Sequence, residues 1–443
     1  MEQWTEVDVT VIGAGPAGLI AAAEAAKCGN RTILLEKNSK VGRKLYISGK
    51  GRCNITNRCD ITSLIKNTPG NGNFLYSAFN GFGPEDIMEY LSKLGVETKV
   101  ERGNRVFPLS DKASDVVDAL YNNVLRNNVD LITEAKVTGI QCESQICRKS
   151  NNETMENSEN DIYNGNEMSC MKRVEYIKDG KTYIIESENV VIATGGVSYP
   201  LTGSTGDGYI FAEKVGHTII EPKPSLIPFV VAEKWVKDLQ GLSLRNVAIT
   251  LIKNGTTKIF SDFGEMLFTH YGVTGPLILS ASSRIRSAKY EDLELFIDLK
   301  PALSSEELDV RIKKDFSKYV NRNFINALDD LLPQSLIPVV VMLSGINESK
   351  LVNQVTKEER QKLLETLKNF KVTPVKPRPI EEAIVTAGGV CIKEINPKTM
   401  ESKIVSGIYF AGEVIDVDCY TGGFNITAAL ATGYASVRSI SQK

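Results

Sequence analysis

The chain has 443 residues, of which 42% are hydrophobic and 24% charged, a globular composition with room for two or three domains. Its 52 Lys and Arg against 54 Asp and Glu leave a net charge of -2, so the molecule as a whole has no electrostatic reason to bind nucleic acid or an anionic membrane. The eight cysteines are scattered and form no Cys-x-x-Cys pair, which argues against a disulfide framework. The chain has two histidines, too few for a typical imidazole-based metal site, so we expect no metal.

The first apolar run begins within a few residues of Met1. No basic segment precedes it and glycines interrupt it, which is typical of neither a signal peptide nor a membrane span. We therefore expect a cytoplasmic protein.

The N-terminal residues have the pattern of a strand, a glycine turn, a helix and a second strand. Residues 7–12 (VDVTVI) are β-branched, residues 13–18 read GAGPAG, an alanine-rich helix follows, and residues 31–37 (RTILLEK) form the next apolar strand, with Glu36 near its end. Glycines in this pattern permit a tight turn, the approach of a pyrophosphate and close packing of helix on strand. The acid accepts hydrogen bonds from ribose hydroxyls and disfavours a 2′-phosphate, so the motif predicts binding of FAD or NAD.

Apolar spacing predicts helices over 84–94 and 110–127. Strands are then predicted at 129–141 and 181–196, and the polar stretch 142–170 between them is predicted to be a long exposed excursion.

Beyond Pro200 the pattern changes to short strands and then to helices. Strands are predicted at 219–231, 244–252, 257–260 and 293–299, helices across 304–370, and a proline-rich linker at 372–379. The simplest organisation is a discontinuous α/β nucleotide-binding domain, 1–199 and 378–443, interrupted by a β-rich insert (200–303) and by a helical insert with linker (304–377).

Two further glycine clusters favour FAD over NAD. Residues 193–196 (ATGG) end a strand in a way that resembles the two-dinucleotide-binding flavoproteins. Residues 407–433 (GIYFAGEVIDVDCYTGGFNITAALATG) resemble the C-terminal flavin-binding motif of the same superfamily. That resemblance implies that Glu413 or Asp416 takes the ribityl hydroxyls and that the amides of residues 423–426 face the N1/O2 edge of the flavin.

Six motifs occur in order: VIGAGPAGL, GRKLYISGKGRCNITN, IATGGVSYPLTGSTGDGY, FTHYGVTGP, VTAGGV and YFAGEVIDVDCYTGGFN. Together they resemble a bacterial flavoprotein family that includes aminoacetone-oxidase-like and bile-acid-pathway-related FAD enzymes. The resemblance implies a Rossmann-like FAD-binding domain interrupted by a β-barrel-like insert and a helical insert, with FAD bound non-covalently.

The loop at 42–54 combines glycines with four cations, which suits a polyphosphate cofactor. We expect its first residues beside the adenosine and pyrophosphate and, by resemblance, its last residues at the isoalloxazine. The residues predicted to contact FAD are Gly13, Ala14, Gly15, Pro16, Ala17, Gly18, Glu36, Lys37, Gly42, Arg43, Lys44, Ser48, Gly49, Gly51, Arg52, Cys53, Asn54, Val137, Ala193, Thr194, Gly195, Gly196, Gly412, Glu413, Asp416, Gly422, Gly423, Phe424, Asn425 and Ile426.

The catalytic residue is left open, with Cys53, His270 and Tyr420 as candidates. The favoured alternatives are structural: Cys53 as a packed thiol, His270 as a structural histidine, and Tyr420 as an aromatic packing residue. No second Gly-x-Gly-x-x-Gly follows a strand in the middle region, so NAD(P)H is expected, if used, as a transient donor.

We therefore predict an FAD-dependent oxidoreductase that acts on a small molecule by hydride transfer, either amine oxidation with dioxygen or NAD(P)H-linked reduction. The alternative is a non-catalytic or sensory flavoprotein with a partner-binding insert, and a tRNA-modifying flavoprotein is less favoured. No nucleic-acid or membrane partner is expected. The substrate, the electron acceptor and the oligomeric state stay open.

Overall fold

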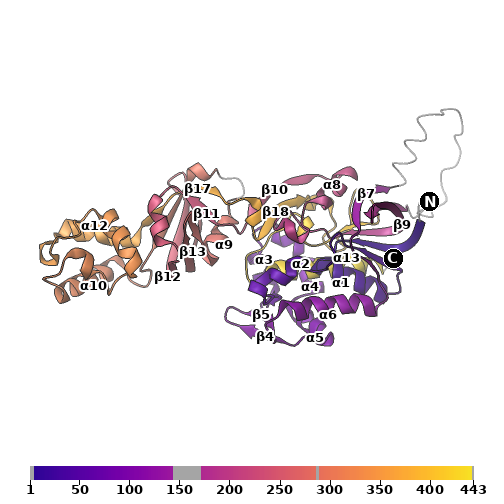
Figure 1. Cartoon of the computed structure of the whole chain (residues 1–443), viewed down its shortest axis with the longest axis horizontal. Helices are drawn as coiled ribbons and strands as arrows, with labels where there is room; N and C mark the ends of the chain where they lie inside the picture. The colour runs from indigo at the N-terminus through magenta and orange to yellow at the C-terminus, as the bar shows by residue number, and fades with distance from the viewer. Residues whose placement is uncertain (1–3, 143–170, 286–288, 442–443) are drawn as a thin grey trace, which may run out of the picture. The chain divides into compact units, whose positions relative to one another are not determined.

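The computed structural model describes residues 4–142, 171–285 and 289–441, so the predicted polar excursion lies almost entirely outside the described residues. The chain divides into two compact units (Figure 1). The first comprises 1–223 and 385–443, and the second comprises 224–384.

The first unit is built on a mixed sheet with the strand order β6-β2-β1-β9-β8-β7, and β19 pairs with β9. β1, β2, β6, β9 and β19 run parallel, whereas β7 and β8 are antiparallel. All four residues of β2 are buried, as expected for a parallel strand covered on both faces. The strands are β1 (Trp4–Ile12), β2 (Thr32–Leu35), β6 (Asp130–Ile132), β7 (Lys136–Cys142), β8 (Lys172–Lys178), β9 (Lys181–Ile192) and β19 (Ile408–Phe410).

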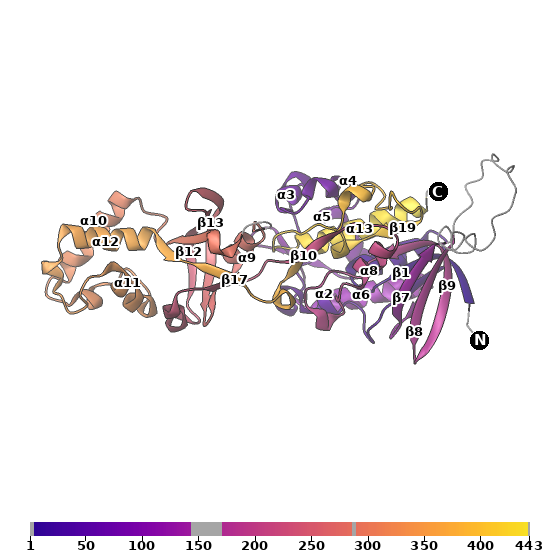
Figure 2. The same cartoon turned by 90° about the horizontal axis from the view of Figure 1, so that it is seen from above.

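Helix α1 (Pro16–Lys27) packs against α6 (Ala113–Arg126) and α13 (Phe424–Ile440). Its alanines at 21, 22, 23 and 25 are fully buried, and a methyl group at Gly433 of α13 would lie 2.3 Å from the Ala17 carbonyl oxygen. Small residues thus bring the two helices into backbone contact. Figure 2 shows α13, in yellow, beside α4 and β19.

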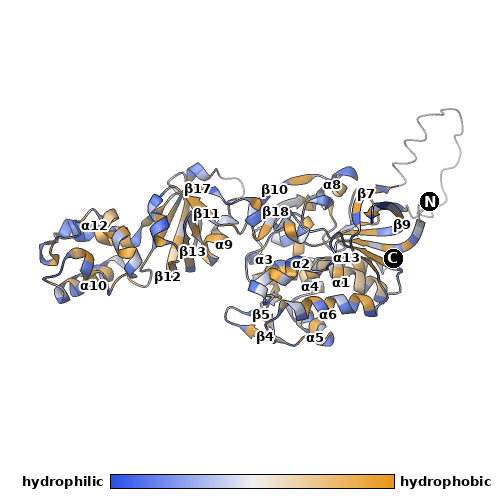
Figure 3. Cartoon of the chain, in the orientation of Figure 1, coloured by the Kyte–Doolittle hydropathy of each residue, from blue (hydrophilic) through white to orange (hydrophobic). Residues whose placement is uncertain are grey.

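Smaller elements complete the first unit. A three-stranded sheet has the order β3-β5-β4, and β10 pairs with β18. Their bounds are β3 (Thr56–Asn57), β4 (Thr98–Glu101), β5 (Arg105–Pro108), β10 (Ile219–Ser225) and β18 (Val385–Val390), with helices α2 (Arg43–Ile47), α3 (Ile61–Lys66), α4 (Tyr76–Gly81), α5 (Pro84–Lys93) and α8 (Asp207–Lys214). Hydrophobic and hydrophilic residues both occur along α6 (Figure 3), whose Val116, Leu120 and Val124 are buried.

The second unit is an antiparallel sheet of order β16-β15-β12-β13-β14-β11-β17 and has four α-helices among its described residues. Phe229, Phe268 and Phe370 are fully buried in its core. Capping boxes begin two of its helices, at Ser304 and Thr356. The bounds are β11 (Phe229–Val231), β12 (Ser243–Lys253), β13 (Thr257–Thr269), β14 (Gly272–Thr274), β15 (Leu293–Asp298), β16 (Phe370–Val372), β17 (Pro374–Pro377), α9 (Pro276–Ser282), α10 (Ser305–Lys318), α11 (Ile337–Ser344) and α12 (Lys357–Lys368).

The division between the units falls at 223/224 and 384/385, whereas the sequence pattern suggested 199/200 and 377/378. Residues 200–223 pack with the first unit for a physical reason. A methyl group at Gly208 of α8 would lie 2.1 Å from Thr194 Oγ1, so α8 sits directly on the end of β9.

His217 is a buried titratable group of the first unit. It is 3% exposed, and its ring meets Phe410 edge-on with 4.7 Å between centroids. Nε2 lies 2.7 Å from Ser402 Oγ, and Nδ1 lies 3.2 Å from a carboxylate oxygen of Glu394. Burial lowers the pKa of His217, and the Glu394 carboxylate opposes this effect without reversing it.

This lowered pKa predicts acid sensitivity. In the unfolded chain the His217 pKa has its ordinary value of about 6.5, so the unfolded chain binds this proton more readily than the folded chain. The contribution of neutral His217 to the free energy of unfolding is therefore present above that pH and is lost as the pH falls below it. We expect the melting temperature of the wild type to exceed that of His217→Gln by a margin that narrows from about pH 7.5 to about pH 5. A margin independent of pH, measured by differential scanning fluorimetry, would contradict this.

Candidate functional site

The first glycine turn joins β1 to α1 by close backbone contacts. Gly13 has a φ of 101°, and a methyl group there would lie 2.6 Å from the Ala193 carbonyl oxygen. One at Gly18 would lie 1.8 Å from the Gly13 carbonyl oxygen. Gly15 differs, since a methyl group there would meet nothing within 4 Å, and this residue begins α1 without a side-chain cap. The start of α1 therefore offers uncapped N–H groups beside open space, which suits a pyrophosphate.

Glu36 is held against this turn. It is 8% exposed, and one of its carboxylate oxygens accepts from the Ala14 N–H at 2.9 Å. The other accepts from the backbone N–H and the side-chain amide of Asn38, at 2.8 and 2.7 Å. A carboxylate has about four acceptor positions and three are used here, so Glu36 keeps capacity for a ribose hydroxyl.

The loop 42–54 runs from the first glycine turn to the third glycine cluster. The Gly42 N–H donates to the Ala14 carbonyl at 2.9 Å. At the other end the Asn54 amide, oriented so that both of its ends are satisfied, accepts from the Gly423 N–H at 3.1 Å. The loop bends through left-handed conformations at Gly49, Lys50, Gly51 and Cys53. Which end of the loop contacts the isoalloxazine stays a prediction.

The third cluster begins α13 and is bound to β3. Gly423 precedes the helix with a φ of 100°, and a methyl group there would lie 2.4 Å from the Thr56 carbonyl carbon. The hydroxyls of Thr56 and Thr427 are 2.7 Å apart, and Asn57 donates to the Gly422 carbonyl at 3.2 Å. The start of α13 is uncapped by any side chain, so it presents a positive helix end.

Two residues predicted to face the cofactor also bind neighbouring backbone. The Asp416 carboxylate accepts from the Gly388 N–H at 3.1 Å and from the Asn71 amide at 2.9 Å. The Asn425 amide accepts from the N–H of Cys419 and donates to its carbonyl, both at 2.9 Å. These side chains thus hold the loop between β19 and α13 in shape.

Glu413 and Lys44 form an ion pair that joins the loop 42–54 to the C-terminal motif and to Ser198, which follows the glycine cluster 193–196. Lys44 Nζ lies 2.6 Å from Glu413 and 2.7 Å from Ser198 Oγ. Glu413 also accepts from the Ser198 hydroxyl at 3.0 Å and from the Thr386 N–H at 2.8 Å. Lys44 therefore reaches the C-terminal motif, and its place beside the adenosine and pyrophosphate stays a prediction. Sequence analysis did not select Ser198 or Thr386, although both lie inside the quoted motifs.

Two buried hydroxyls in this region, Thr194 Oγ1 and the Tyr209 hydroxyl, make no hydrogen bond to any of the residues that the structure describes. Burial raises the pKa of Tyr209, so it stays a phenol that can donate. Free hydroxyls, an uncapped helix start and open space at Gly15 fit a ligand that carries phosphates and hydroxyls, as FAD does.

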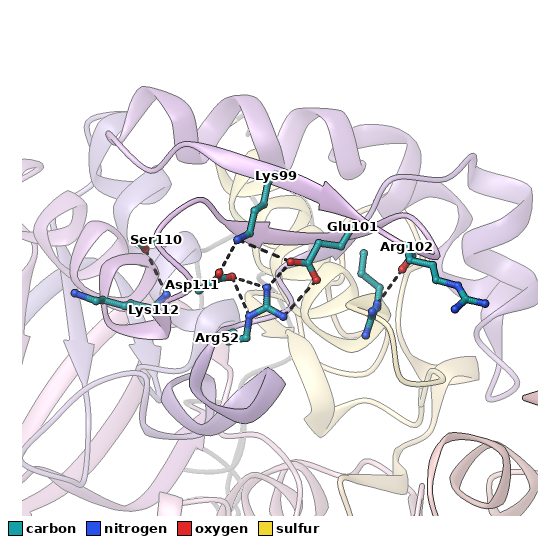
Figure 4. Close-up of polar contacts among 8 residues, drawn as sticks. Arg52, Lys99, Glu101, Arg102, Ser110, Asp111 and Lys112 are labelled. Atoms are coloured by element: carbon teal, nitrogen blue, oxygen red, sulfur yellow. Dashed lines mark hydrogen bonds and ion pairs between the residues drawn. The ribbon is translucent and has the colours of Figure 1, made fainter. Parts of the chain in front are cut away.

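The other three predicted cations, like Lys44, contact acidic or polar side chains. Lys37 pairs with Asp207 at 2.6 Å, and Arg43 donates to Asn38 at 2.7 Å. Arg52 pairs with Glu101 and Asp111 and lies 4.2 Å from the centre of the Phe107 ring. Figure 4 shows the Arg52 guanidinium turned toward these two carboxylates.

The catalytic candidates occupy different settings. Cys53 is fully buried, and burial raises its pKa to about 12, so the thiol is protonated at neutral pH. Tyr420 is half-buried, and its N–H donates to the Asn67 carbonyl at 2.8 Å. His270 is exposed in the second unit, where its ring contacts Tyr271. Val137, predicted to contact FAD, lies buried in the hydrophobic core of the first unit.

No group of three or more His, Cys, Asp or Glu within 4–142, 171–285 and 289–441 could hold a metal ion. In the same residues, every helix is too short or too polar to span a bilayer.

The glycine geometry separates folding from cofactor binding. We expect Gly15→Ala to keep the melting temperature of the FAD-free protein but to bind FAD at least about tenfold more weakly, because its methyl group enters the pyrophosphate space. Gly18→Ala should lower the melting temperature itself, because backbone blocks the methyl group. Gly81→Ala, whose methyl group would meet nothing within 4 Å, is the control and should change neither. Wild-type FAD affinity in Gly15→Ala, measured by fluorescence titration, would exclude the pyrophosphate from this turn.

The chain is similar over its whole length to three characterised proteins. It is 30% identical over 450 residues to "Ribosomal RNA dihydrouridine synthase" of Haemophilus influenzae, covering 100% of both chains. It is 29% identical to the protein of the same name in Escherichia coli, covering 98% of both. It is 26% identical to "3-dehydro-bile acid delta(4,6)-reductase" of Clostridium scindens, covering 98% of this chain and 99% of that one.

These relatives correct one expectation. We predicted that no nucleic acid is a partner, and the full-length similarity to two ribosomal RNA dihydrouridine synthases contradicts this. The prediction used the net charge of the whole chain, which does not describe how charge is distributed over the surface. The bile-acid part of the resemblance is confirmed, and the aminoacetone-oxidase part stays a prediction.

A solved structure agrees on the fold. The 3-ketosteroid delta1-dehydrogenase from Sterolibacterium denitrificans superposes with a TM-score of 0.52 at 12% identity, covering 99% of this chain and 100% of that one. The family model described as "HI0933-like protein Rossmann domain" matches residues 7–439. The chain belongs to the HI0933-like family of flavoprotein oxidoreductases, which have a Rossmann-type FAD-binding fold.

Proposed function

We propose that this protein is an FAD-dependent reductase that saturates a carbon–carbon double bond conjugated to a carbonyl, and that its substrate is a uracil base in RNA. The observation that carries the proposal is the 30% identity to the Haemophilus influenzae ribosomal RNA dihydrouridine synthase over both complete chains. The name of the Clostridium scindens relative describes reduction of double bonds in a 3-keto compound, which is the same bond type in a different molecule.

The proposed reaction balances with a nicotinamide donor. Uridine, NAD(P)H and one proton give dihydrouridine and NAD(P)⁺: a hydride adds to uracil C6, the carbon β to the C4 carbonyl, and a proton adds to C5. FAD, when bound, supplies the hydride-transfer chemistry between donor and substrate. The chain has one Gly-x-Gly-x-x-Gly motif between a strand and a helix, so we propose that the nicotinamide visits the flavin site and leaves before the base enters.

The residues of the first unit have separate tasks in this proposal. Residues 13–18 hold the pyrophosphate at the start of α1, and Glu36 holds the adenosine ribose. The start of α13, at Gly423, lies against β3 and the end of the loop 42–54. Its positive end would stabilise negative charge on a flavin bound there.

A second candidate is a small, hydrophobic enone as substrate. It is supported by the 26% identity to the Clostridium scindens reductase over nearly both whole chains. In both candidates NAD(P)H reduces the flavin, and they differ only in the molecule that the reduced flavin then reduces. One experiment that varies this molecule therefore separates them.

That experiment follows flavin colour without oxygen. We expect NADH or NADPH to bleach the absorbance near about 450 nm, and deproteinised bacterial ribosomal RNA lacking dihydrouridine to restore it. Nuclease digestion and mass spectrometry should then find uridine converted to dihydrouridine. Restoration by a 3-keto-4-ene steroid and not by RNA would favour the second candidate. Bleaching by a small amine, with restoration by dioxygen alone, would replace both with amine oxidation.

Cys53 is not required as the proton donor in this scheme. A general acid works best with a pKa near the working pH, whereas burial raises the pKa of Cys53 to about 12. We expect Cys53→Ala to keep turnover within about threefold of wild type. Cys419→Ala is the matched control, because that thiol is also fully buried with a pKa raised to about 12. A loss above about a hundredfold in Cys53→Ala alone would identify Cys53 as the acid.

A further inference from the structure

Positive charge is concentrated in two segments of the first unit. Residues 42–54 and 98–112 together hold eight Lys and Arg but two acids, in a chain whose net charge is -2. The second segment contains the β4–β5 hairpin, whose turn is formed by residues 102–104. The segments meet where Arg52 contacts Glu101 and Asp111.

The two acids are already neutralised. Arg52 pairs with both, and Lys99 lies 2.5 Å from Asp111 and 3.8 Å from Glu101 (Figure 4). These four side chains form a closed network with equal numbers of positive and negative charges. Neither carboxylate is therefore available to offset the remaining cations.

Five cations of these segments outside the network remain exposed. Arg43 donates to Asn38, and we call the other four the basic edge: Lys50, Arg102, Arg105 and Lys112. Within the described residues, none of them has a carboxylate at ion-pair distance. Arg105 Nε donates to the Arg102 carbonyl at 3.1 Å, which keeps the two arginines together at the hairpin turn. Figure 4 shows the Arg102 guanidinium pointing away from the network.

The hairpin turn is attached to the candidate FAD site. The Asn57 amide donates both to the Gly103 carbonyl at 3.0 Å and to the Gly422 carbonyl at 3.2 Å, so one side chain bridges the turn and the glycines that begin α13. The Arg58 N–H donates to the Asn104 carbonyl at 2.7 Å. Left-handed conformations at Gly103 and Asn104 make the bend. The arginines are thereby fixed at the border of the site.

From this arrangement we infer that the basic edge binds the phosphates of the RNA that presents its base to the flavin, an inference that rests on the proposed function. Guanidinium groups match phosphate oxygens in a bidentate geometry, and exposed cations without acid partners attract a polyanion. Phosphate contacts orient a strand without reading its sequence. The basic edge therefore positions the RNA backbone, while the flavin site receives the base.

The test uses the full-length FAD-loaded protein and a fluorescein-labelled, uridine-containing single-stranded RNA of about 20 nucleotides. The variant is Arg102→Gln/Arg105→Gln, with Arg102→Lys/Arg105→Lys to keep the charge. The matched control is Lys178→Gln/Lys181→Gln, which removes one cation on each side of the β8–β9 turn in the same unit. Melting temperature and bound FAD serve as the check on folding.

We expect the Gln variant to bind RNA about tenfold more weakly near about 0.1 M salt. Its slope of log Kd against log salt should fall by about 1.4, since each phosphate contact on a single strand contributes about 0.7. The Lys variant and the Lys178→Gln/Lys181→Gln control should keep slopes close to the wild type. Dihydrouridine formation by the Gln variant should recover as RNA concentration is raised.

Three results would overturn the inference. One is an unchanged affinity and slope in the Gln variant, and another is an equal loss in the control. The third is a raised KM for NADPH with unchanged RNA affinity, which would assign the arginines to the donor. Failure of the proposed function looks different: the wild type would then form no dihydrouridine at any RNA concentration, whatever the variants do to binding.

Discussion

The structure depends on backbone packed against backbone at a few glycines. Methyl groups at Gly18, Gly433 and Gly423 would lie 1.8, 2.3 and 2.4 Å from main-chain atoms of neighbouring segments. Because these residues carry no side chain, α1 can lie on the end of β1, α13 can lie on α1, and β3 can lie on the start of α13. Glycine also precedes each of these helices, as Gly15 before α1 and Gly423 before α13, and it leaves both N-termini without side-chain caps. At Gly423 one residue serves both packing and the positive helix end, whereas at α1 Gly18 serves the packing and Gly15 leaves open space for an anion.

The sequence allowed much of this to be predicted, because the βαβ fingerprint is local. Gly13, Gly15, Gly18 and Glu36 lie within one short stretch, and the structure brings Glu36 onto the turn at Ala14, while the cofactor contacts of these residues stay predictions. The contacts across the motifs could not be predicted in the same way. Lys44 meets Glu413 across 369 positions of sequence, and no local periodicity encodes such a pairing. Resemblance supplied the direction of the loop 42–54, which local pattern alone left open.

The error about nucleic acid has a physical explanation. A net charge adds all residues with equal weight, whereas binding depends on cations that are exposed and lack acid partners. In this chain Arg52 and Lys99 take up Glu101 and Asp111, so the neighbouring cations keep their full charge although the total is nearly zero. The loop 42–54 is predicted to bind the cofactor, with FAD contacts expected for three of its four cations, Arg43, Lys44 and Arg52. In the structure Lys44 and Arg52 pair with carboxylates, Arg43 donates to Asn38, and Lys50 is exposed.

One relative is named for an RNA modification and another for a bile-acid reduction, and both are similar to this chain over nearly its whole length. This limits which parts of the fold can determine substrate specificity. A uracil ring and a 3-keto steroid both offer a double bond conjugated to a carbonyl, so the flavin and its two helix ends need not differ between them.

The contacts to the rest of the substrate molecule must differ. A base in RNA has to leave its stack, at a cost of a few kcal/mol, and contacts to the flanking phosphates can offset that cost. A steroid has no phosphates, so exposed cations at the border of the site would contribute nothing to its binding. The charge of the β4–β5 hairpin therefore distinguishes an RNA substrate from a steroid substrate better than the residues predicted to contact FAD do.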